Sequence, residues 1–156
     1  MTEADYMRAA IAKTREGIDA GQSPFGSVIV REGQIVEATH NTVWMTTDPT
    51  AHAEVNCIRA ASKALNTIFL RGCTLYSTTE PCPMCLSAIH WAKIERVVFG
   101  ATIGDAANAG FAELFIEAKQ MAVLGQSPLK VESGLLQAEC AALFDEWKKA
   151  GKCKPY

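Results

Sequence analysis

The sequence has no long apolar run and no excess of basic residues. Its longest stretch without Asp, Glu, Lys or Arg covers residues 81–92, whereas a transmembrane helix needs roughly 18 to 20 apolar residues. The chain carries 15 Lys and Arg against 17 Asp and Glu, and a nucleic-acid-binding domain is usually clearly basic. We therefore expect no membrane association and no extensive nucleic-acid surface.

We also expect no leader segment, and the sequence shows no internal repeat or flexible linker. Residues 1–5 are acidic, whereas a secretory signal peptide begins with basic residues followed by an apolar stretch, so we expect a cytoplasmic protein. An apolar fraction of 49% with 21% charged residues excludes intrinsic disorder. The length suits one domain over residues 1–156.

Hydrophobic periodicity predicts alternating helices and strands. The expected helices cover residues 4–20, 52–65, 83–93, 112–121 and 135–149. The expected strands cover residues 25–31, 34–40, 73–77, 96–101 and 129–132. Residues 42–50 are predicted to form a polar loop, and residues 151–156 an irregular basic tail. This order predicts the α/β class, as a three-layer α/β/α domain with a mixed five-stranded sheet.

Two of the six cysteines have a spacing suited to a metal. Cys82 and Cys85 stand two residues apart at the start of a predicted helix, and His52 starts another. The partial positive charge of a helix N-terminus lowers the pKa of a thiol and so favours a thiolate ligand. Three protein ligands leave the fourth tetrahedral position of zinc open, as in catalytic sites. The pattern predicts one zinc ion per chain, held by His52, Cys82 and Cys85.

Glu54 lies two residues after His52 and is expected to act on protons rather than on the metal. Zinc lowers the pKa of a bound water to about 7. A neighbouring carboxylate can take a proton and later deliver it to a leaving amine. His-x-Glu together with Pro-Cys-x-x-Cys is the known signature of zinc-dependent base deaminases.

Two other interpretations of the cysteine pair remain open. A structural zinc site would need a fourth ligand, with Cys57, Cys73, His40 and His90 as the candidates. None of these has a paired spacing, and Glu54 would have no role. A thioredoxin-type redox pair would require neither His52 nor Glu54. The remaining cysteines are expected to be ordinary packing or surface residues.

On these motifs the sequence resembles the cytidine and deoxycytidylate deaminase superfamily, and within it the small bacterial guanine deaminases. The resemblance runs from residue 24 to about residue 115 and returns at the C-terminus. The matching segments are residues 24–26, Asn41, and residues 48–55, 80–85, 88–92 and 105–111.

The resemblance implies roles for five further residues. Asn41 would hydrogen-bond the substrate ring, and Phe25 would shape a purine pocket. Trp91 would wall the active site, in this family often across a dimer interface. Glu113 falls where these guanine deaminases carry an Asp that helps move protons to the leaving ammonia. Tyr156 matches a C-terminal aromatic residue that closes the pocket after a domain-swapped crossing of the tail.

Each of these residues also has a purely structural interpretation. Phe25 and Trp91 could serve only packing or a dimer interface, and Asn41 could cap a turn. Glu113 could be a solvated helix residue, and Tyr156 could be disordered, as terminal residues often are. Residues 152–155 depart from the family's usual tail.

The resemblance implies a homodimer that hydrolyses guanine to xanthine and ammonia. The apolar segment 87–91, on the predicted helix after Cys85, could supply the interface. A tRNA adenosine deaminase shares the zinc motifs but needs a surface that binds phosphates. In this sequence the basic residues that cluster are lysines near the C-terminus: Lys148, Lys149, Lys152 and Lys154. Cytosine, a guanosine-like nucleoside or another amino-heterocycle are further candidate substrates.

A non-catalytic zinc module would leave Glu54 without a role. We expect a small nucleobase substrate and no nucleic-acid partner.

Overall fold

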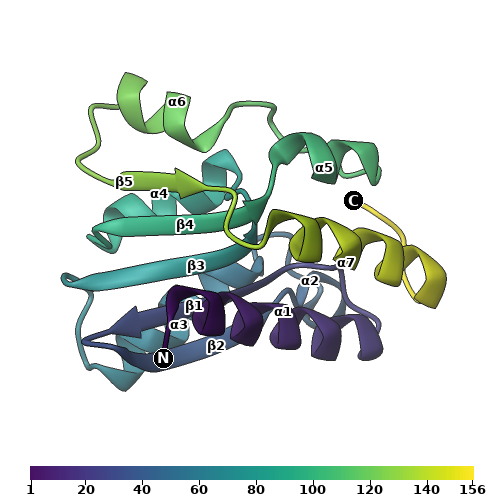
Figure 1. The fold of residues 1–156 in the computed structure, drawn as a ribbon, viewed down its shortest axis with the longest axis horizontal. Helices are drawn as coiled ribbons and strands as arrows, with labels where there is room; N and C mark the ends of the chain where they lie inside the picture. The colour runs from purple at the N-terminus through teal and green to yellow at the C-terminus, as the bar shows by residue number, and fades with distance from the viewer.

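Five strands form one mixed sheet in the order β2-β1-β3-β4-β5 (Figure 1). The computed structural model describes all residues 1–156. The strands are β1 (Gly26–Arg31), β2 (Gln34–His40), β3 (Cys73–Thr79), β4 (Arg96–Ala101) and β5 (Lys130–Ser133). β1 is antiparallel to β2 and β3, whereas β4 is parallel to β3 and β5. The predicted α/β class with a mixed five-stranded sheet is confirmed.

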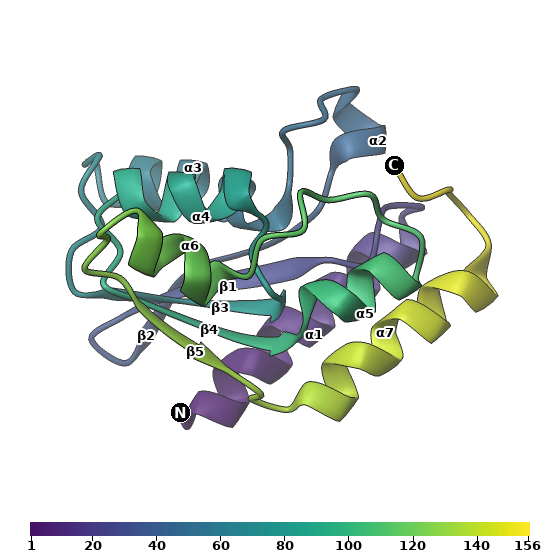
Figure 2. The ribbon, with the colours of Figure 1, turned by 90° about the horizontal axis from the view of Figure 1, so that it is seen from above.

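Helices cover both faces of this sheet (Figure 2). One face carries α1 (Glu3–Asp19), α5 (Ile103–Asn108) and α7 (Gln137–Ala150). The other carries α3 (Ala53–Ala64), α4 (Pro83–Trp91) and α6 (Ala118–Leu124). No helix combines the length and the apolar character that a membrane crossing requires.

The strands separate two hydrophobic cores because successive residues point to opposite faces of a sheet. Val28 and Val30 pack in the core beneath α1 and α7, and Ile29 between them packs beneath α3 and α4. In β4 the same alternation sends Val98 to the first core and Val97 to the second. The apolar run in β4 is therefore buried on both sides.

Local sequence signals explain most of the element boundaries. The side chains of Thr2 and Asp5 form the predicted capping box at the start of α1. Glu32 and Gly33 both have positive φ angles, of 51° and 74°, which is the conformation of a two-residue hairpin turn. The expected hairpin between β1 and β2 is confirmed.

The structure differs from the expected elements at three places. Residues 111–117 have no regular structure, and α6 begins only at Ala118, so the helix predicted over 112–121 is wrong for residues 112–117. The short helix α5 was not predicted, although Thr102 and Asp105 form a capping box at its start. The predicted loop 42–50 contains one short helix, α2 (Val43–Thr46). Seven or fewer residues show too little periodicity to be recognised from sequence.

Gly26 allows α1 to lie close to the start of β1, beside Phe25. A Cβ atom at Gly26 would lie 2.6 Å from the carbonyl oxygen of Ala10 and 2.9 Å from the backbone nitrogen of Thr14. Both distances are shorter than a van der Waals contact, so no larger residue fits unless α1 moves away from the sheet.

We therefore expect Gly26→Ala to lower the free energy of unfolding by about 2 kcal/mol, because the packed helix must shift. Gly104→Ala is the control. A Cβ atom at Gly104 would meet only Thr102 Oγ1, at 3.5 Å, and Gly104 lies in α5, where alanine is favoured over glycine. Urea unfolding measures both variants. Equal unfolding free energies for the two would contradict the expected clash.

Candidate active site

His52, Cys82 and Cys85 meet at the edge of the sheet where β2 and β3 end. Because β1 is antiparallel to both of these strands, β2 and β3 run in the same direction and end at the same edge. His52 is the N-cap residue of α3, and Cys82 is the N-cap residue of α4. Neither side chain caps its own helix, so both are free to bind a ligand.

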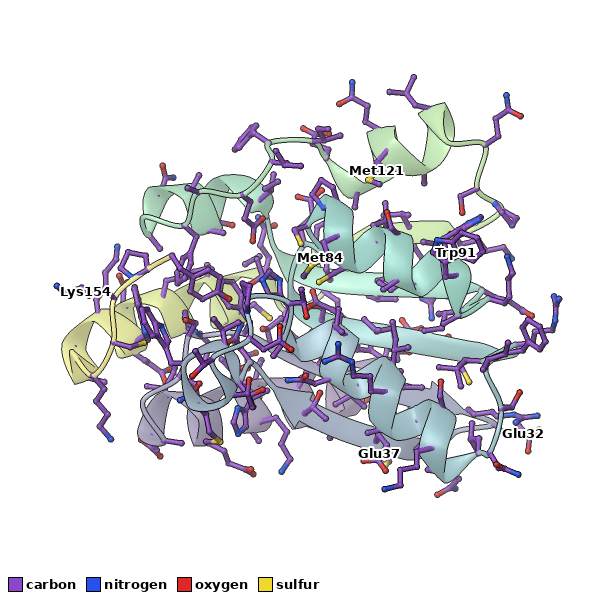
Figure 3. The ribbon with its side chains drawn as sticks, turned by 180° about the vertical axis from the view of Figure 1, so that it is seen from behind. Glu32, Glu37, Met84, Trp91, Met121 and Lys154 are labelled. Carbon is purple, nitrogen blue, oxygen red and sulfur yellow. The ribbon has the colours of Figure 1, made fainter.

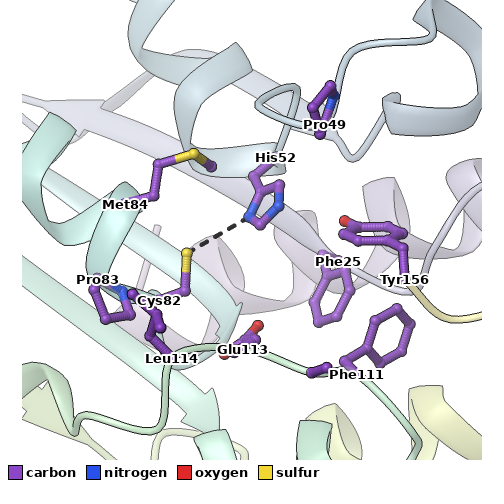
Figure 4. Close-up of a pocket in the computed structure, with 11 residues that line it drawn as sticks. Phe25, Pro49, His52, Cys82, Pro83, Met84, Phe111, Glu113, Leu114 and Tyr156 are labelled. Carbon is purple, nitrogen blue, oxygen red and sulfur yellow. Dashed lines mark hydrogen bonds between the residues drawn. The ribbon is translucent and has the colours of Figure 1, made fainter.

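The three donor atoms have the spacing of a tetrahedral zinc site. His52 Nδ1 lies 3.7 Å from Cys82 Sγ (Figure 4) and 3.5 Å from Cys85 Sγ, and the three donor atoms lie within 4.8 Å of one another. At ordinary bond lengths, a tetrahedral zinc separates a nitrogen from a sulfur ligand by about 3.6 Å. The residues present therefore fit the ion.

The two thiols differ in their electrostatic surroundings. Hydrogen bonds from Cys85 and from His52 lower the pKa of Cys82 to about 4. The hydrogen bond to Cys82 and burial raise the pKa of Cys85. One thiolate is thus stabilised by the protein itself, and a divalent cation deprotonates a thiol that coordinates it.

No further His, Cys, Asp or Glu donor atom joins this cluster. The rings of His40 and His90 bond instead to a backbone carbonyl and to a serine hydroxyl. Cys57 and Cys73 are buried in the core beneath α3 and α4. A structural site with four protein ligands is therefore unsupported, and three donors leave one position open.

Glu54 lies in the first turn of α3, with its side chain buried beside the metal donors. Ser77 Oγ on β3 donates a hydrogen bond to Glu54 Oε1 at 3.1 Å. Burial, and after it the charge on Cys82, raises the pKa of Glu54. A carboxyl group with a raised pKa exchanges protons more readily near neutral pH.

A cavity of about 220 Å³ opens beside the donors, smaller than the roughly 300–1,000 Å³ of most drug-sized sites. Phe25, Phe111 and Tyr156 form an aromatic wall, with ring centroids 4.8 Å apart for Phe25 and Phe111 and 5.6 Å apart for Phe111 and Tyr156. The other lining residues are Pro49, His52, Cys82, Pro83, Met84, Ala112, Glu113 and Leu114. No Lys or Arg lines the cavity.

Glu113 lies in the irregular segment 111–117, and its side chain points into this cavity (Figure 4). Its Oε2 atom is buried and has no hydrogen-bond partner, which is uncommon for a buried polar atom. Burial, with the neighbouring Cys82, raises the pKa of Glu113 to about 8. The carboxyl group is therefore available to a molecule in the cavity.

Asn41 and Tyr156 are joined by a hydrogen bond beside the cavity, which Tyr156 lines. Asn41 is fully buried at the end of β2, and its Nδ2 donates to Tyr156 Oη at 2.6 Å. Its Oδ1 accepts a hydrogen bond from the backbone N–H of Val43, so it also caps a turn. The tail places Tyr156 over the site of its own chain, where the centroids of the Tyr156 and His52 rings lie 5.8 Å apart. The backbone carbonyl of Tyr156 accepts a hydrogen bond from the N–H of Ala112.

The sequence profile of the cytidine and deoxycytidylate deaminase zinc-binding region matches residues 1–101. The chain belongs to this deaminase family. It is accordingly a hydrolytic deaminase of a zinc-binding family, and His52, Cys82 and Cys85 are the residues able to hold the ion.

Relatives of this deaminase act on more than one kind of substrate. Guanine deaminase of Bacillus subtilis (strain 168) is 46% identical over 117 residues, which cover 74% of this chain and 75% of the relative. A tRNA-specific adenosine deaminase of the same organism is 36% identical over 151 residues, covering 94% and 91%. The structure of guanine deaminase from Nitrosomonas europaea superimposes with a TM-score of 0.86 at 26% identity, covering 95% of this chain and 85% of that one.

Of the substrate-contact residues predicted from sequence, Phe25 and Tyr156 line the cavity and Asn41 reaches it only through its bond to Tyr156, whereas Trp91 lies away from the cavity. It lies at the C-terminal end of α4 and is 75% exposed. It lines a separate groove with Ser87, His90 and Met121, and Figure 3 shows Trp91, Met84 and Met121 on one side of the molecule. Within one chain, Trp91 has no access to the cavity.

Two residues of the site were missed by sequence reasoning. Phe111 supplies a wall of the cavity and lies in a segment that matches the family, but an aromatic residue after a glycine carries no signal of its own. Ser77 contacts Glu54 across two elements, and nothing in the local sequence pairs them. The contact arises only from the way β3 packs against the start of α3.

The metal site leads to a prediction about zinc content. Cys85→Ser should reduce bound zinc from about one ion per chain to little or none, because a neutral hydroxyl replaces a thiolate ligand. Cys153→Ser, in the half-exposed tail, is the matched control and should keep its zinc. Metal analysis of the purified proteins measures both. A Cys85→Ser variant that still holds one zinc per chain would contradict the assignment.

Proposed function

We propose that this deaminase hydrolyses guanine to xanthine and ammonia. The observation that carries the proposal is the lining of the cavity, which is aromatic and apolar with one carboxyl group and no Lys or Arg. A flat, uncharged base suits such walls, whereas a nucleic-acid strand requires contacts to its phosphates. The likeness to guanine deaminases of two organisms supports the same substrate.

The zinc ion would be held by His52, Cys82 and Cys85. When bound, it would supply a water of lowered pKa and a positive charge beside the reacting carbon. The net reaction places the oxygen of one water on C2 of the base and breaks the bond from C2 to its amino group. One proton of that water ends on the ring nitrogen and the other on ammonia.

Glu54 would carry the first of these protons. Its buried carboxyl group lies beside the metal donors, and Ser77 holds one of its two oxygens. The other oxygen is left to take a proton from the attacking water and pass it to the ring nitrogen. Glu54 and Glu113 together would then protonate the leaving amine, since Glu113 reaches the cavity with an unpaired oxygen.

Asn41, Phe25 and Tyr156 would orient the base. The Asn41 amide has two N–H donors, one of which goes to Tyr156, and the second would donate to an acceptor on the ring. Phe25 would contact the flat face of the purine. Tyr156 would cover the base and exclude bulk water, which strengthens the electrostatic interactions inside the site.

A tRNA adenosine deaminase is the second candidate. The 36% identity to such an enzyme over 94% of this chain favours it. It would have to bind phosphates outside the cavity, with a strong dependence on salt. A gel shift with tRNA that weakens as salt is raised, together with inosine formation, would support this candidate over guanine.

The substrate proposal is tested with a panel of guanine, adenosine in tRNA, cytosine and guanosine. We expect ammonia release from guanine at the highest kcat/KM. Glu54→Gln should lower kcat by at least about 100-fold, because the proton carrier is lost, while its zinc content stays at the wild-type level. Turnover of another member of the panel with none of guanine would refute the substrate, and an active Glu54→Gln would refute the proton carrier.

We also propose that two copies of the chain pair through the exposed face of α4. Trp91 is 75% exposed at its end, and Met84 is partly exposed at its start. Large exposed apolar side chains on one helix can mark an interaction surface. In such a pair Trp91 could reach the partner's site, which it does not reach in its own chain. Exchange of the tail 151–156 between the two copies stays a prediction.

Sedimentation at two protein concentrations tests the pairing. We expect wild type and Trp91→Phe to sediment as dimers, because phenylalanine keeps an apolar contact. Trp91→Lys should shift the equilibrium toward monomer, since a charge would be buried without a partner. A wild-type protein that remains monomeric at both concentrations would contradict the proposed interface.

A further inference from the structure

Glu80 is a buried carboxylate that the proposed reaction does not use. It lies between the end of β3 and the zinc-ligand segment, two residues before Cys82, and only 6% of it is exposed. Its Oε2 accepts a hydrogen bond from the backbone N–H of Ile103 at 2.9 Å. Its Oε1 accepts one from the backbone N–H of Ala118 at 2.8 Å.

These two N–H groups belong to the first residues of two different helices. Ile103 follows the N-cap residue of α5, and Ala118 follows the N-cap residue of α6. The first N–H groups of a helix have no partner within it. In α6 the N-cap side chain makes no capping bond, so Glu80 supplies that bond from outside the helix.

The chain between these two helices carries Glu113. Figure 2 shows this segment crossing from α5 to α6 along one end of the sheet. Between residues 112 and 118, only two backbone N–H groups bond to distant parts of the chain. Ala112 donates to the Tyr156 carbonyl, and Ala118 donates to Glu80. The Glu113 Oε2 atom has no partner, so these backbone bonds hold its position.

We propose that Glu80 is a positioning residue, which holds the segment carrying Glu113 against the zinc site. The proposal rests on the role of Glu113 in the proposed function. Glu80 connects the segment that supplies Cys82 to the first residues of α5 and α6, the two helices that flank the segment supplying Glu113. A carboxylate is suited to this because each of its two oxygens accepts one N–H. Glutamine offers one such oxygen and turns an amide N–H₂ toward the other donor.

Two variants break this connection by different means. Glu80→Gln leaves one of the two N–H groups opposite an amide donor. Ala118→Pro keeps Glu80 but removes the Ala118 N–H, at a helix position where proline is well tolerated. Glu117 already has ψ 138°, the extended conformation that a residue before proline adopts. Ala118→Ser keeps the N–H and is the matched control.

The first measurement is hydrogen exchange, which does not depend on activity. We expect peptides covering residues 109–117 to exchange about tenfold faster in Glu80→Gln and in Ala118→Pro, because the segment loses a tether. Peptides of α1 and the zinc content should match wild type. Ala118→Ser should exchange as wild type does. Unchanged exchange of residues 109–117 in both variants that break the connection would overturn the proposal.

The second measurement is a double-mutant cycle on kcat, with whichever base of the panel is turned over fastest. Glu80→Gln should lower kcat by about tenfold in the wild-type background, since small displacements of a reacting group are costly. In the Glu113→Gln background it should lower kcat less than about twofold, because there is no longer a carboxylate to position.

Equal losses in the two backgrounds would overturn the proposal, as would a Glu113→Gln variant with wild-type kcat. Failure of the substrate assignment is a separate outcome. If the enzyme turns over another base but not guanine, the assignment to guanine is refuted while the cycle is still measured on that base.

Discussion

The site of this deaminase depends on the convergence of two helix N-termini at one edge of the sheet. β1 is the only strand antiparallel to the other four. β2 and β3, on either side of β1, therefore run in the same direction and end at the same edge of the sheet. Each of these strands leads to a helix whose N-cap residue is a metal donor. Ligands of α/β sheets commonly bind at the carboxyl ends of strands for this reason. The partial positive charge of a helix N-terminus favours the thiolate form of Cys82, the N-cap residue of α4.

Two buried carboxyl groups and one half-buried one surround this edge, and each has a different environment. Glu80 has both oxygens paired with backbone N–H groups, Glu54 has one paired with a hydroxyl, and Glu113 has an oxygen with no partner. Burying an unpaired polar atom costs stability. Polar atoms without hydrogen-bond partners are expected mainly at functional sites. Here Glu80, proposed to position a segment, has both oxygens paired, whereas Glu54 and Glu113, proposed to move protons, have fewer hydrogen bonds.

The scaffold alone does not determine the substrate, because relatives with the same metal site include guanine and tRNA adenosine deaminases. The difference must lie in what surrounds the cavity. Much of that surrounding comes from the least regular parts of this chain. Segment 111–117 and the C-terminal tail together supply Phe111, Glu113 and Tyr156. A change in either segment can alter the pocket without disturbing the sheet or the metal donors.

The sequence by itself determined the class of fold, the three metal donors and most strand boundaries. These follow from short-range patterns: alternation along β1 and β4, the two-residue spacing of Cys82 and Cys85, and the capping box of α1. Tertiary structure alone decided that residues 111–117 are irregular, that Trp91 faces away from its own pocket, and that Tyr156 returns to Asn41. It also decided that Glu80 bonds to residues 23 and 38 positions further along the chain. Contacts at such separations leave no periodic signal in the sequence, because they depend on where the packed sheet brings each segment.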